Sequence, residues 1–188
     1  KHGGERVLDT PISETAIMGA AIGSAATGMR PIANIMFSEF LGICFSEVMN
    51  VLTKLRYMTG GKVQLPVTIM AYSGAGISAA GEHSACLNGL LMSVTGLKVA
   101  IPSTPYDAKG LLKAAVRSNN PVVFFENKLG YTATGAVPAE PYLVALGRAD
   151  VKRSGRHVTV VSVGAALARV EEAALELDGH GIDVEIID

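Results

Sequence analysis

Pro66-Val67-Thr68-Ile69-Met70-Ala71 is a nearly continuous apolar run with the length of a β-strand. Strands that helices cover on both faces lack the alternation of apolar and polar residues, so such runs are typical of parallel sheets. Leu97-Lys98-Val99-Ala100-Ile101-Pro102 and Pro121-Val122-Val123-Phe124-Phe125-Glu126 are further strand candidates later in the chain. Together the three segments predict a buried parallel sheet.

Helix-start signals lie between and ahead of these strands. Thr104-Pro105 combines a residue that caps helix N-termini with a proline suited to the first helical position. Ser13 is a comparable cap ahead of an alanine-rich stretch. The glycines of that stretch, at positions 19, 23 and 28, would weaken an isolated helix, so they indicate that another helix or a ligand packs close to one face.

The whole chain alternates short β-branched runs with longer helical stretches. The helices are expected at residues 14–28, 39–58, 84–92 and 105–117, and two more strands at residues 6–9 and 30–37. Within residues 39–58 the apolar positions expected to face the core are Phe40, Cys44, Val48, Val51 and Leu55. This alternation predicts an α/β fold.

The pattern fails after residue 127 and begins again near residue 157. Glycines and prolines predict an extended connection from residue 127 to residue 154, and Lys152-Arg153-Ser154-Gly155 reads as a turn. A strand at 157–163, a helix at 165–177 and a strand at 182–187 then form a new unit. One βαβ unit is too small to be a domain, so we expect the natural chain to extend beyond both ends of this one.

Composition and charge limit the possible functions. Of the 188 residues 49% are hydrophobic and only 18% are charged, which suggests that part of the surface is hidden against another subunit. Sixteen basic and seventeen acidic residues leave a net charge of −1, so nucleic acid is not an expected partner. The longest uncharged run, residues 63–81, contains Gln64, Pro66 and three glycines and does not predict a membrane span.

Three local features could carry chemistry. Glu14 is a carboxylate in the first turn of a helix, where a role in stabilising the helix dipole is the commoner one, but beside a small, apolar stretch it could also exchange protons. The loop at residues 74–81 matches a dinucleotide fingerprint weakly, and the acidic residue that such a site needs about 20 positions later is missing. His83 is a histidine within a glycine-rich loop that joins a strand to a helix.

Several motifs follow one another along essentially the whole chain. Arg6-Val7-Leu8-Asp9-Thr10-Pro11-Ile12-Ser13-Glu14 and Pro102-Ser103-Thr104-Pro105-Tyr106-Asp107-Ala108-Lys109-Gly110-Leu111 are the longest, and the others are at residues 27–31, 36–40, 56–61, 82–84, 96–99 and 119–123. In order and content they resemble the β subunits of thiamine-diphosphate-dependent 2-oxo acid dehydrogenases. This family includes the pyruvate, branched-chain 2-oxo acid and acetoin enzymes.

The resemblance implies a fold and a domain order. It implies an α/β fold: a parallel-sheet thiamine-diphosphate-binding domain, the transketolase-like pyrimidine domain, with helices on both faces and the start of a second α/β domain after it. On this basis we place the pyrimidine-binding domain at residues 1–130, a linker at 131–155 and the opening of the C-terminal domain at 156–188.

Each site residue of the family can be carried over to a matching position. The resemblance implies that Glu14 hydrogen-bonds the aminopyrimidine ring of the cofactor, that Phe40 packs against that ring, and that Ile12 makes a backbone contact. It implies that His83 is the active-site histidine. A monovalent-cation site for K⁺, built from backbone carbonyls, would map near Ala115, Ser118 and Asn120.

One departure from the family pattern concerns the histidine motif. The family has glutamine before the histidine and again after the serine, whereas this chain has Glu82 and Ala85. A carboxylate beside His83 favours the imidazolium form and would alter proton delivery or substrate preference.

The resemblance also implies partners. The substrate would be a small 2-oxo acid, decarboxylated with transfer of the acyl group to a lipoyl-bearing acyltransferase core, or acetoin in the members that cleave it. No Gly-Asp-Gly motif occurs in the chain, so the ligands of Mg²⁺ would come from an α subunit in an α2β2 heterotetramer. With no leader or membrane segment predicted, we expect a protein of the bacterial cytoplasm or of an organellar matrix.

Other interpretations remain open. A transketolase or deoxysugar-phosphate synthase would carry both cofactor-binding domains on one longer chain. A subunit without catalytic residues of its own could act as a scaffold in the same complex. A plain dinucleotide-binding module is the third alternative, which the missing acidic residue disfavours.

Overall fold

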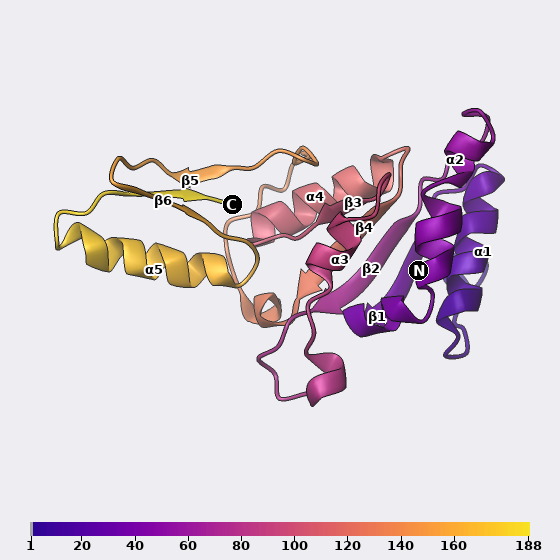
Figure 1. The fold of residues 1–188 in the computed structure, drawn as a ribbon, viewed down its shortest axis with the longest axis horizontal. Coiled ribbons are helices and arrows are strands. Elements are labelled where there is room, and N and C mark those ends of the chain that lie inside the picture. Colours follow the sequence, from indigo (N-terminus) through magenta and orange to yellow (C-terminus); the bar gives the residue numbers. More distant parts are fainter. Residues whose placement is uncertain (1) are drawn as a thin grey trace.

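The computed structural model describes residues 2–188, and its strands form two sheets of four and three strands. The larger sheet has the strand order β1-β2-β4-β3, and every neighbouring pair is parallel (Figure 1). Its strands are β1 (Ile32–Phe37), β2 (Thr68–Ser73), β3 (Lys98–Ala100) and β4 (Val122–Asn127). The parallel sheet expected from the apolar runs is therefore confirmed.

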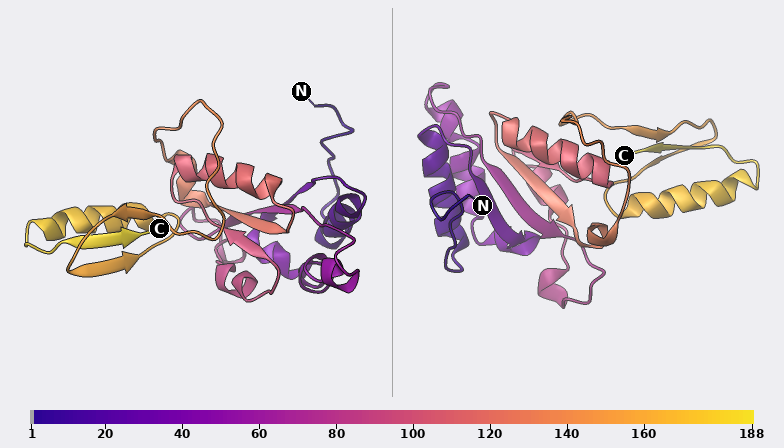
Figure 2. Two further views of the ribbon diagram at one scale, coloured as in Figure 1. Left: turned by 90° about the horizontal axis from the view of Figure 1, so that it is seen from above. Right: turned by 180° about the vertical axis from the view of Figure 1, so that it is seen from behind.

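Helices cover both faces of this sheet, as Figure 2 shows from above. The helical segments are α1 (Glu14–Ala26), the 3-10 helix η1 (Ser38–Gly42), the π-helix η2 (Glu47–Leu52), α2 (Leu55–Met58), the 3-10 turn η3 (Gly81–His83), α3 (Asn88–Met92), α4 (Pro105–Arg117) and the 3-10 helix η4 (Lys128–Thr132). On one face the side chains of α1, η1, η2 and α3 share a single core cluster with β1 and β2. Helix α4 packs against the other face.

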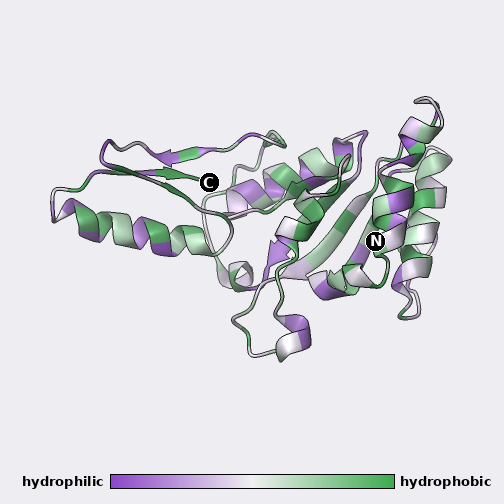
Figure 3. Cartoon of the chain, in the orientation of Figure 1, coloured by the Kyte–Doolittle hydropathy of each residue, from purple (hydrophilic) through white to green (hydrophobic). Residues whose placement is uncertain are grey.

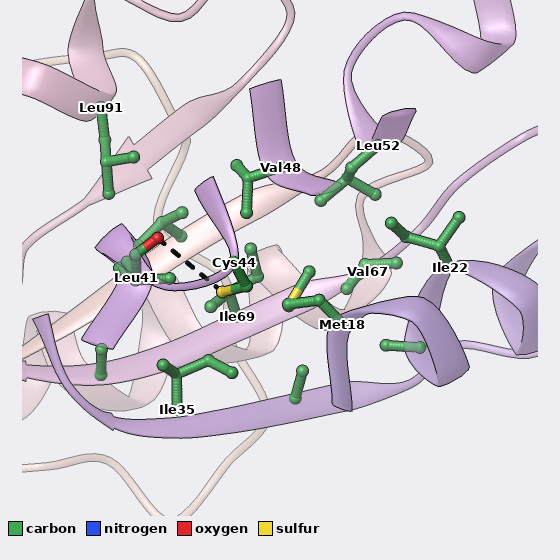
Figure 4. Packing of buried hydrophobic residues seen from close by; sticks show 14 of the residues in the cluster. Met18, Ile22, Ile35, Leu41, Cys44, Val48, Leu52, Val67, Ile69 and Leu91 are labelled. Carbon is green, nitrogen blue, oxygen red and sulfur yellow. Dashed lines mark hydrogen bonds between the residues drawn. The ribbon is translucent and has the colours of Figure 1, made fainter. Parts of the chain in front are cut away.

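Strand β4 shows why the run of apolar residues has no polar alternation. Val123 and Phe125 belong to the larger core, whereas Val122 and Phe124 pack with residues of α4 in the smaller one. Successive side chains of a strand point to opposite faces, and here both faces are covered, so every one of them must be apolar. Figure 4 shows the larger core, to which Met18 of α1 and Ile69 of β2 both contribute.

Two of the expected elements differ from the structure. Residues 6–9, predicted as a strand, are not in a sheet, and Val7 and Leu8 are largely exposed. Residues 39–58 are not one α-helix but a 3-10 helix, a π-helix and a short α-helix in succession. Of the positions expected to face the core, Cys44 and Val48 are buried and Phe40 and Leu55 pack against the core, but Val51 is exposed. The π-helix changes the angular spacing of residues, and Leu52 is buried in place of Val51.

Helix α1 is confirmed, but its glycine face is open. Within the described residues no atom lies within 4 Å of the position that a Cβ would take at Gly19 or Gly23. The buried face of α1 instead consists of Met18, Ala21, Ile22 and Ala25. No helix in residues 2–188 combines the length and the apolar character that crossing a bilayer requires.

The second unit is a three-stranded sheet with one helix. It comprises β5 (Val151–Arg153), β6 (Val158–Val161), α5 (Ala166–Asp178) and β7 (Val184–Ile187) in the strand order β5-β7-β6. Hydrophobic and hydrophilic residues alternate along α5 in Figure 3, and its apolar side buries Leu167 and Ala174 against the sheet. The expected strand-helix-strand unit is confirmed, but Lys152 and Arg153, predicted to lie in a turn, form β5, which pairs antiparallel with β7.

The two units meet through a polar cluster. The Lys152 ammonium lies 3.0 Å from a carboxylate oxygen of Asp107 in α4 and 3.6 Å from one of Asp188. The Ser103 hydroxyl donates a hydrogen bond to Asp188 and accepts one of 2.7 Å from the backbone N–H of Gly164. Buried ionic groups of this kind are stable only when paired, so the cluster fixes one orientation of the second unit against α4.

Gly155 provides a sharp test of the second sheet. A Cβ at this position would lie 2.1 Å from the backbone carbonyl carbon of Val184 and 2.2 Å from the backbone nitrogen of Glu185. Because backbone atoms of a paired strand cannot move aside, we expect Gly155→Ala to destabilise this unit by at least about 3 kcal/mol. Urea denaturation followed by hydrogen exchange of β5 and β7 would measure the loss.

Gly135→Ala is the matched control for that variant. Its Cβ would have ordinary contacts of 3.5 Å with Pro105, so its unfolding free energy should stay within about 0.5 kcal/mol of the parent. Equal stability of the two variants would contradict the close approach of Gly155 to β7.

Candidate functional site

The candidate site lies where the strands of the larger sheet end. Phe37, Ser73 and Asn127 are the last residues of the adjacent strands β1, β2 and β4. In open parallel α/β sheets, ligands bind outside the carboxyl ends of the strands. Figure 1 shows that the loop after β2, which carries His83, projects from this end of the sheet.

Aromatic rings cluster at this end of the sheet. The ring of Phe37 lies edge-to-face against His83, with 4.2 Å between the ring centroids, and against Phe40 at 5.7 Å. Phe40 in turn lies 5.6 Å from His83. The structure thus brings together two residues that the sequence predicted for the site, Phe40 and His83, across 43 positions of chain. Tyr72 and Tyr131 extend the cluster, since Tyr72 lies 5.6 Å from Phe37 and 5.5 Å from Tyr131.

Strained backbone surrounds the cluster. Met36, Ser78 and Ala80 have positive φ angles of 67°, 55° and 62°, and within residues 2–188 no other non-glycine residue does. Met36 lies at an irregularity in the pairing of β1 with β2, directly before Phe37, and its backbone N–H donates a 3.0 Å hydrogen bond to the Asn34 side chain. Such a backbone conformation costs about 1–3 kcal/mol per residue and is found most often at functional sites, where it changes the direction of particular side chains.

Glu14 begins α1 with only 8% of its surface exposed. The first turn of α1 packs against the end of η1, where the Thr15 hydroxyl donates a 3.4 Å hydrogen bond to the carbonyl of Ile43. Burial, together with the charges of Glu47 and Glu14, raises the pKa of the neighbouring Cys44 thiol to about 11. The structure gives the Glu14 carboxylate no hydrogen-bond donor or ion-pair partner within residues 2–188. Its oxygens are not among the enclosed side-chain atoms of the described residues, so the carboxylate is available to a group outside the chain.

The remaining predicted residues of this site have distinct environments. Ile12, two residues before α1, is 96% exposed, so its backbone and side chain are open to a ligand or a second chain. Phe40 is half-buried and packs against the core that contains Cys44. The Cys44 sulfur lies 3.9 Å from the carbonyl oxygen of Phe40, which links the Glu14 end of α1 to the aromatic cluster.

Two charged residues that the sequence did not single out, Lys128 and Glu39, hold the loop that carries His83. The ammonium of Lys128 donates a hydrogen bond to the backbone carbonyl of His83 and another, of 3.0 Å, to that of Gly74. A carboxylate oxygen of Glu39 accepts a 2.5 Å hydrogen bond from the backbone N–H of Ala85. Lys128 is 45 positions from His83, and nothing in the local pattern around it could have indicated this contact.

The charge state of Glu39 follows from these contacts. Burial by itself would raise the pKa of the Glu39 carboxyl, but the hydrogen bonds from the backbone N–H of Ala85 and from the Ser38 hydroxyl, with the charge of Lys128, bring the pKa below its usual value. Glu39 is therefore a carboxylate at neutral pH. Lys128 and Glu39 form an oppositely charged pair around the histidine loop.

A cavity of about 640 Å³ adjoins the tyrosines of the cluster on the α4 side of the sheet. Tyr72, Glu126 and Tyr131 line the end nearest the cluster, and Thr104, Lys109 and Phe124 belong to the rest of its wall. Tyr131 donates a hydrogen bond to Glu126. Desolvation raises the pKa of Tyr131, and its bonds with Glu126 and Tyr72 raise it further, so this hydroxyl stays protonated.

The three residues predicted to bind a monovalent cation lie together at the C-terminus of α4. The backbone carbonyl of Ala115 accepts a 3.0 Å hydrogen bond from the Ser118 N–H, and that of Asn120 accepts one of 2.9 Å from the Ser118 hydroxyl. The Ser118 carbonyl accepts a 2.9 Å hydrogen bond from the Arg30 guanidinium. Residues 2–188 contain no cluster of three or more His, Cys, Asp or Glu side chains suited to a metal ion. The cation site stays a prediction.

Comparison with family models places this architecture among known proteins. Residues 1–133 match the model of the transketolase pyrimidine binding domain, and residues 147–188 match that of the transketolase C-terminal domain. A solved structure of a split-gene transketolase, described as an inactive beta4 tetramer, superposes with a TM-score of 0.77 at 25% identity, over 94% of this chain and 54% of that one.

Curated relatives match over the full length of the chain. The β subunit of acetoin:2,6-dichlorophenolindophenol oxidoreductase from Bacillus subtilis is 52% identical over all of this chain and 55% of its own length. The 2-oxoisovalerate dehydrogenase β subunit of Bacillus subtilis and the pyruvate dehydrogenase E1 β subunit of Gracilaria tenuistipitata are each 42% identical, over 58% of their lengths. This chain thus spans little more than half the length of these relatives.

The fold, the match over residues 1–133 and the relatives agree with one another. The parallel sheet with helices on both faces belongs to the pyrimidine-binding part, and the sheet of β5, β7 and β6 begins within the part that matches the C-terminal domain. The chain belongs to the transketolase pyrimidine-binding domain family and is similar to the β subunits of acetoin, branched-chain 2-oxo acid and pyruvate dehydrogenases.

Proposed function

We propose that this chain is the pyrimidine-binding part of the β subunit of a thiamine-diphosphate-dependent dehydrogenase component. The observation that carries the proposal is Glu14, a mostly buried carboxylate that its own chain leaves unpaired, near an aromatic and histidine cluster at the carboxyl ends of the strands. The side chain is mostly buried, but its carboxylate oxygens are not among the enclosed polar atoms of residues 2–188, so a ligand or a second chain can pair with them.

The residues present fit the pyrimidine ring of thiamine diphosphate. An unpaired acid beside the exposed segment at Ile12 can pair with a nitrogen of the ring, and the half-buried ring of Phe40 can pack against its face. When bound, the cofactor supplies a nucleophilic carbon and an electron sink for breaking a carbon–carbon bond next to a carbonyl group. The protein contributes binding, orientation and proton transfer.

Glu14 would hold a proton at its carboxyl group and donate it in a hydrogen bond to a ring nitrogen. Its low exposure strengthens such a bond because little water competes for it. His83 would move a proton between its imidazole and the substrate, with Phe37 and Phe40 limiting the orientation of its ring. Glu82, next to His83, is exposed, so its carboxylate faces water or a second chain.

A partner subunit would complete the site. Val7, Leu8 and Ile12 are largely exposed apolar residues beside Glu14, and the glycine face of α1 is open as well. A surface of this kind fits an α subunit that carries the diphosphate and Mg²⁺ ligands in an α2β2 assembly. A lipoyl-bearing acyltransferase core and a K⁺ ion held by the carbonyls of Ala115, Ser118 and Asn120 belong to the same proposal.

Acetoin is the substrate that the comparisons favour. The two acetoin oxidoreductase β subunits are 52% and 50% identical to this chain, whereas the 2-oxoisovalerate and pyruvate dehydrogenase β subunits are 41–43% identical. A small 2-oxo acid such as pyruvate is the second candidate, because the same residues would serve both cleavages. The bacterial cytoplasm or an organellar matrix stays the predicted location.

The experiment that tests this proposal uses the full-length β subunit co-expressed with its α subunit. We expect dye reduction that depends on thiamine diphosphate, at least about tenfold faster in kcat/KM with acetoin than with pyruvate or 2-oxoisovalerate, since a difference of 1.4 kcal/mol in a specificity pocket suffices for this ratio. A preference for a 2-oxo acid would favour the second candidate. A stable complex that binds the cofactor but turns over none of the three would favour the scaffold interpretation.

A further inference from the structure

The loop at residues 74–85 presents His83 but lacks a hydrophobic anchor of its own. None of its residues is buried. Its base is closed by a 3.0 Å hydrogen bond from the backbone N–H of Gly74 to the carbonyl of Ala85. The loop contains glycines, and Ser78 and Ala80 have positive φ angles that are unfavourable for non-glycine residues. This conformation therefore depends on contacts with residues outside the loop.

Lys128 contacts both sides of this loop from the end of a neighbouring strand. It lies directly after β4, and only 5% of its surface is exposed. Its ammonium has three donors: it bonds the carbonyls of Gly74 and His83, and it lies 4.9 Å from the centroid of the Phe37 ring. Every side of this buried cation therefore faces an electron-rich group, and two of these groups adjoin the imidazole of His83.

Glu39 holds the loop from the opposite side. One of its carboxylate oxygens accepts the bond from the N–H of Ala85, and the other accepts a 2.9 Å bond from the Ser38 hydroxyl. That hydroxyl also lies 3.1 Å from the carbonyl of Ala85. The ends of β1 and β4 thus fix the loop that follows β2, which lies between them in the sheet.

We propose that Lys128 is a positioning residue which, with Glu39, holds the loop so that the His83 imidazole stays against Phe37 and Phe40 in its working orientation. Lys128 would act through the backbone of His83 and not by touching the substrate. Loss of such a support typically costs about 10- to 100-fold in activity, because a displacement of about 1 Å is enough to misplace a catalytic group. The expected loss of activity rests on the proposed function, whereas the expected loosening of the loop does not.

The test compares Lys128→Met and Lys128→Arg in the full-length αβ complex. We expect Lys128→Met to raise hydrogen exchange of the amides at residues 74–85 at least about tenfold and to lower kcat about 10- to 100-fold. The KM should change by less than about threefold, because ground-state binding is untouched. Lys128→Arg, which keeps the charge and the donors, should restore most of both. If Lys128→Met fails to fold, Glu39→Gln should likewise raise the exchange of the loop and lower kcat with little change in KM.

Lys54→Met is the matched control. Lys54 is an exposed lysine that also donates a hydrogen bond, of 3.4 Å to the side chain of Asn50, and it does not line the cavity beside the aromatic cluster. Its removal should leave both the exchange of the loop and kcat unchanged. Unaltered loop exchange in Lys128→Met, or a loosened loop with full kcat, would overturn the inference. A parent complex with no thiamine-dependent turnover would contradict the proposed function instead, while the exchange measurement would still decide whether Lys128 holds the loop.

Discussion

Replacing Glu14 with glutamine is expected to lower the turnover of the full-length αβ complex about 10,000-fold, to the limit of detection. Glutamine has the same shape but cannot hold a transferable proton at that position. The chain gives the Glu14 carboxylate no partner within residues 2–188, so no internal contact is lost with it. Steady-state rates with saturating thiamine diphosphate and acetoin, and with pyruvate, measure the effect.

The same variant should be about as stable as the parent. A carboxylate in the first turn of a helix contributes well under about 1 kcal/mol through the dipole, and the amide of glutamine fills the same space. Glu172→Gln, an exposed glutamate of α5, is the control and should leave both rate and stability unchanged. Near-normal turnover of Glu14→Gln would contradict the proposed role of Glu14 and with it the cofactor site.

Replacing His83 with alanine is expected to lower kcat about 100- to 1,000-fold while the cofactor still binds. The imidazole is the proton-transferring group in the proposal, and its contacts are with Phe37 and Phe40 and not with the core. Calorimetric titration with thiamine diphosphate should give a dissociation constant within about threefold of the parent, because the lost group acts on the reacting substrate. Rates and binding measured on the same preparation separate the two effects.

His180→Ala is the control for that measurement. His180 is an exposed residue at the end of α5, and its removal should have no effect on kcat. If His83→Ala instead lost cofactor affinity with an unchanged kcat, then His83 would be a binding residue and another group would transfer the proton.

Local sequence patterns predicted the central elements because local physics determines them. Helix α4 begins at Pro105, as the Thr104-Pro105 pair predicted, and the Thr104 hydroxyl accepts the expected capping hydrogen bond of 3.2 Å from the N–H of Asp107. The apolar runs of β2 and β4 require cover on both faces, and that requirement already implies helices on each side of a parallel sheet. The parts of the site taken from family motifs, Phe40 and His83, meet in the structure at 5.6 Å.

Elements whose conformation depends on distant contacts were not predictable in this way. Residues 6–9 have strand-like composition but no strand to pair with among residues 2–188. The π-helix at Glu47–Leu52 lies in contact with α1, and within it Leu52 is buried in place of Val51. Strand β5 contains Lys152 and Arg153, whose local sequence is typical of a turn. Pairing with β7 makes this segment a strand, and the carboxylates of Asp107 and Asp188 pair with Lys152.

The sequence by itself therefore determined the fold class and the family and supplied the predicted site residues, because short-range patterns and motifs carry this information. Only the tertiary structure decided that Glu14 is a mostly buried residue without a side-chain partner in residues 2–188, and that Lys128 and Glu39, just after the ends of β4 and β1, bond the loop of His83. The physical reason is distance along the chain. A hydrogen bond from an ammonium to a carbonyl 45 residues earlier depends on how three parallel strands place their ends side by side, and no local propensity encodes that placement.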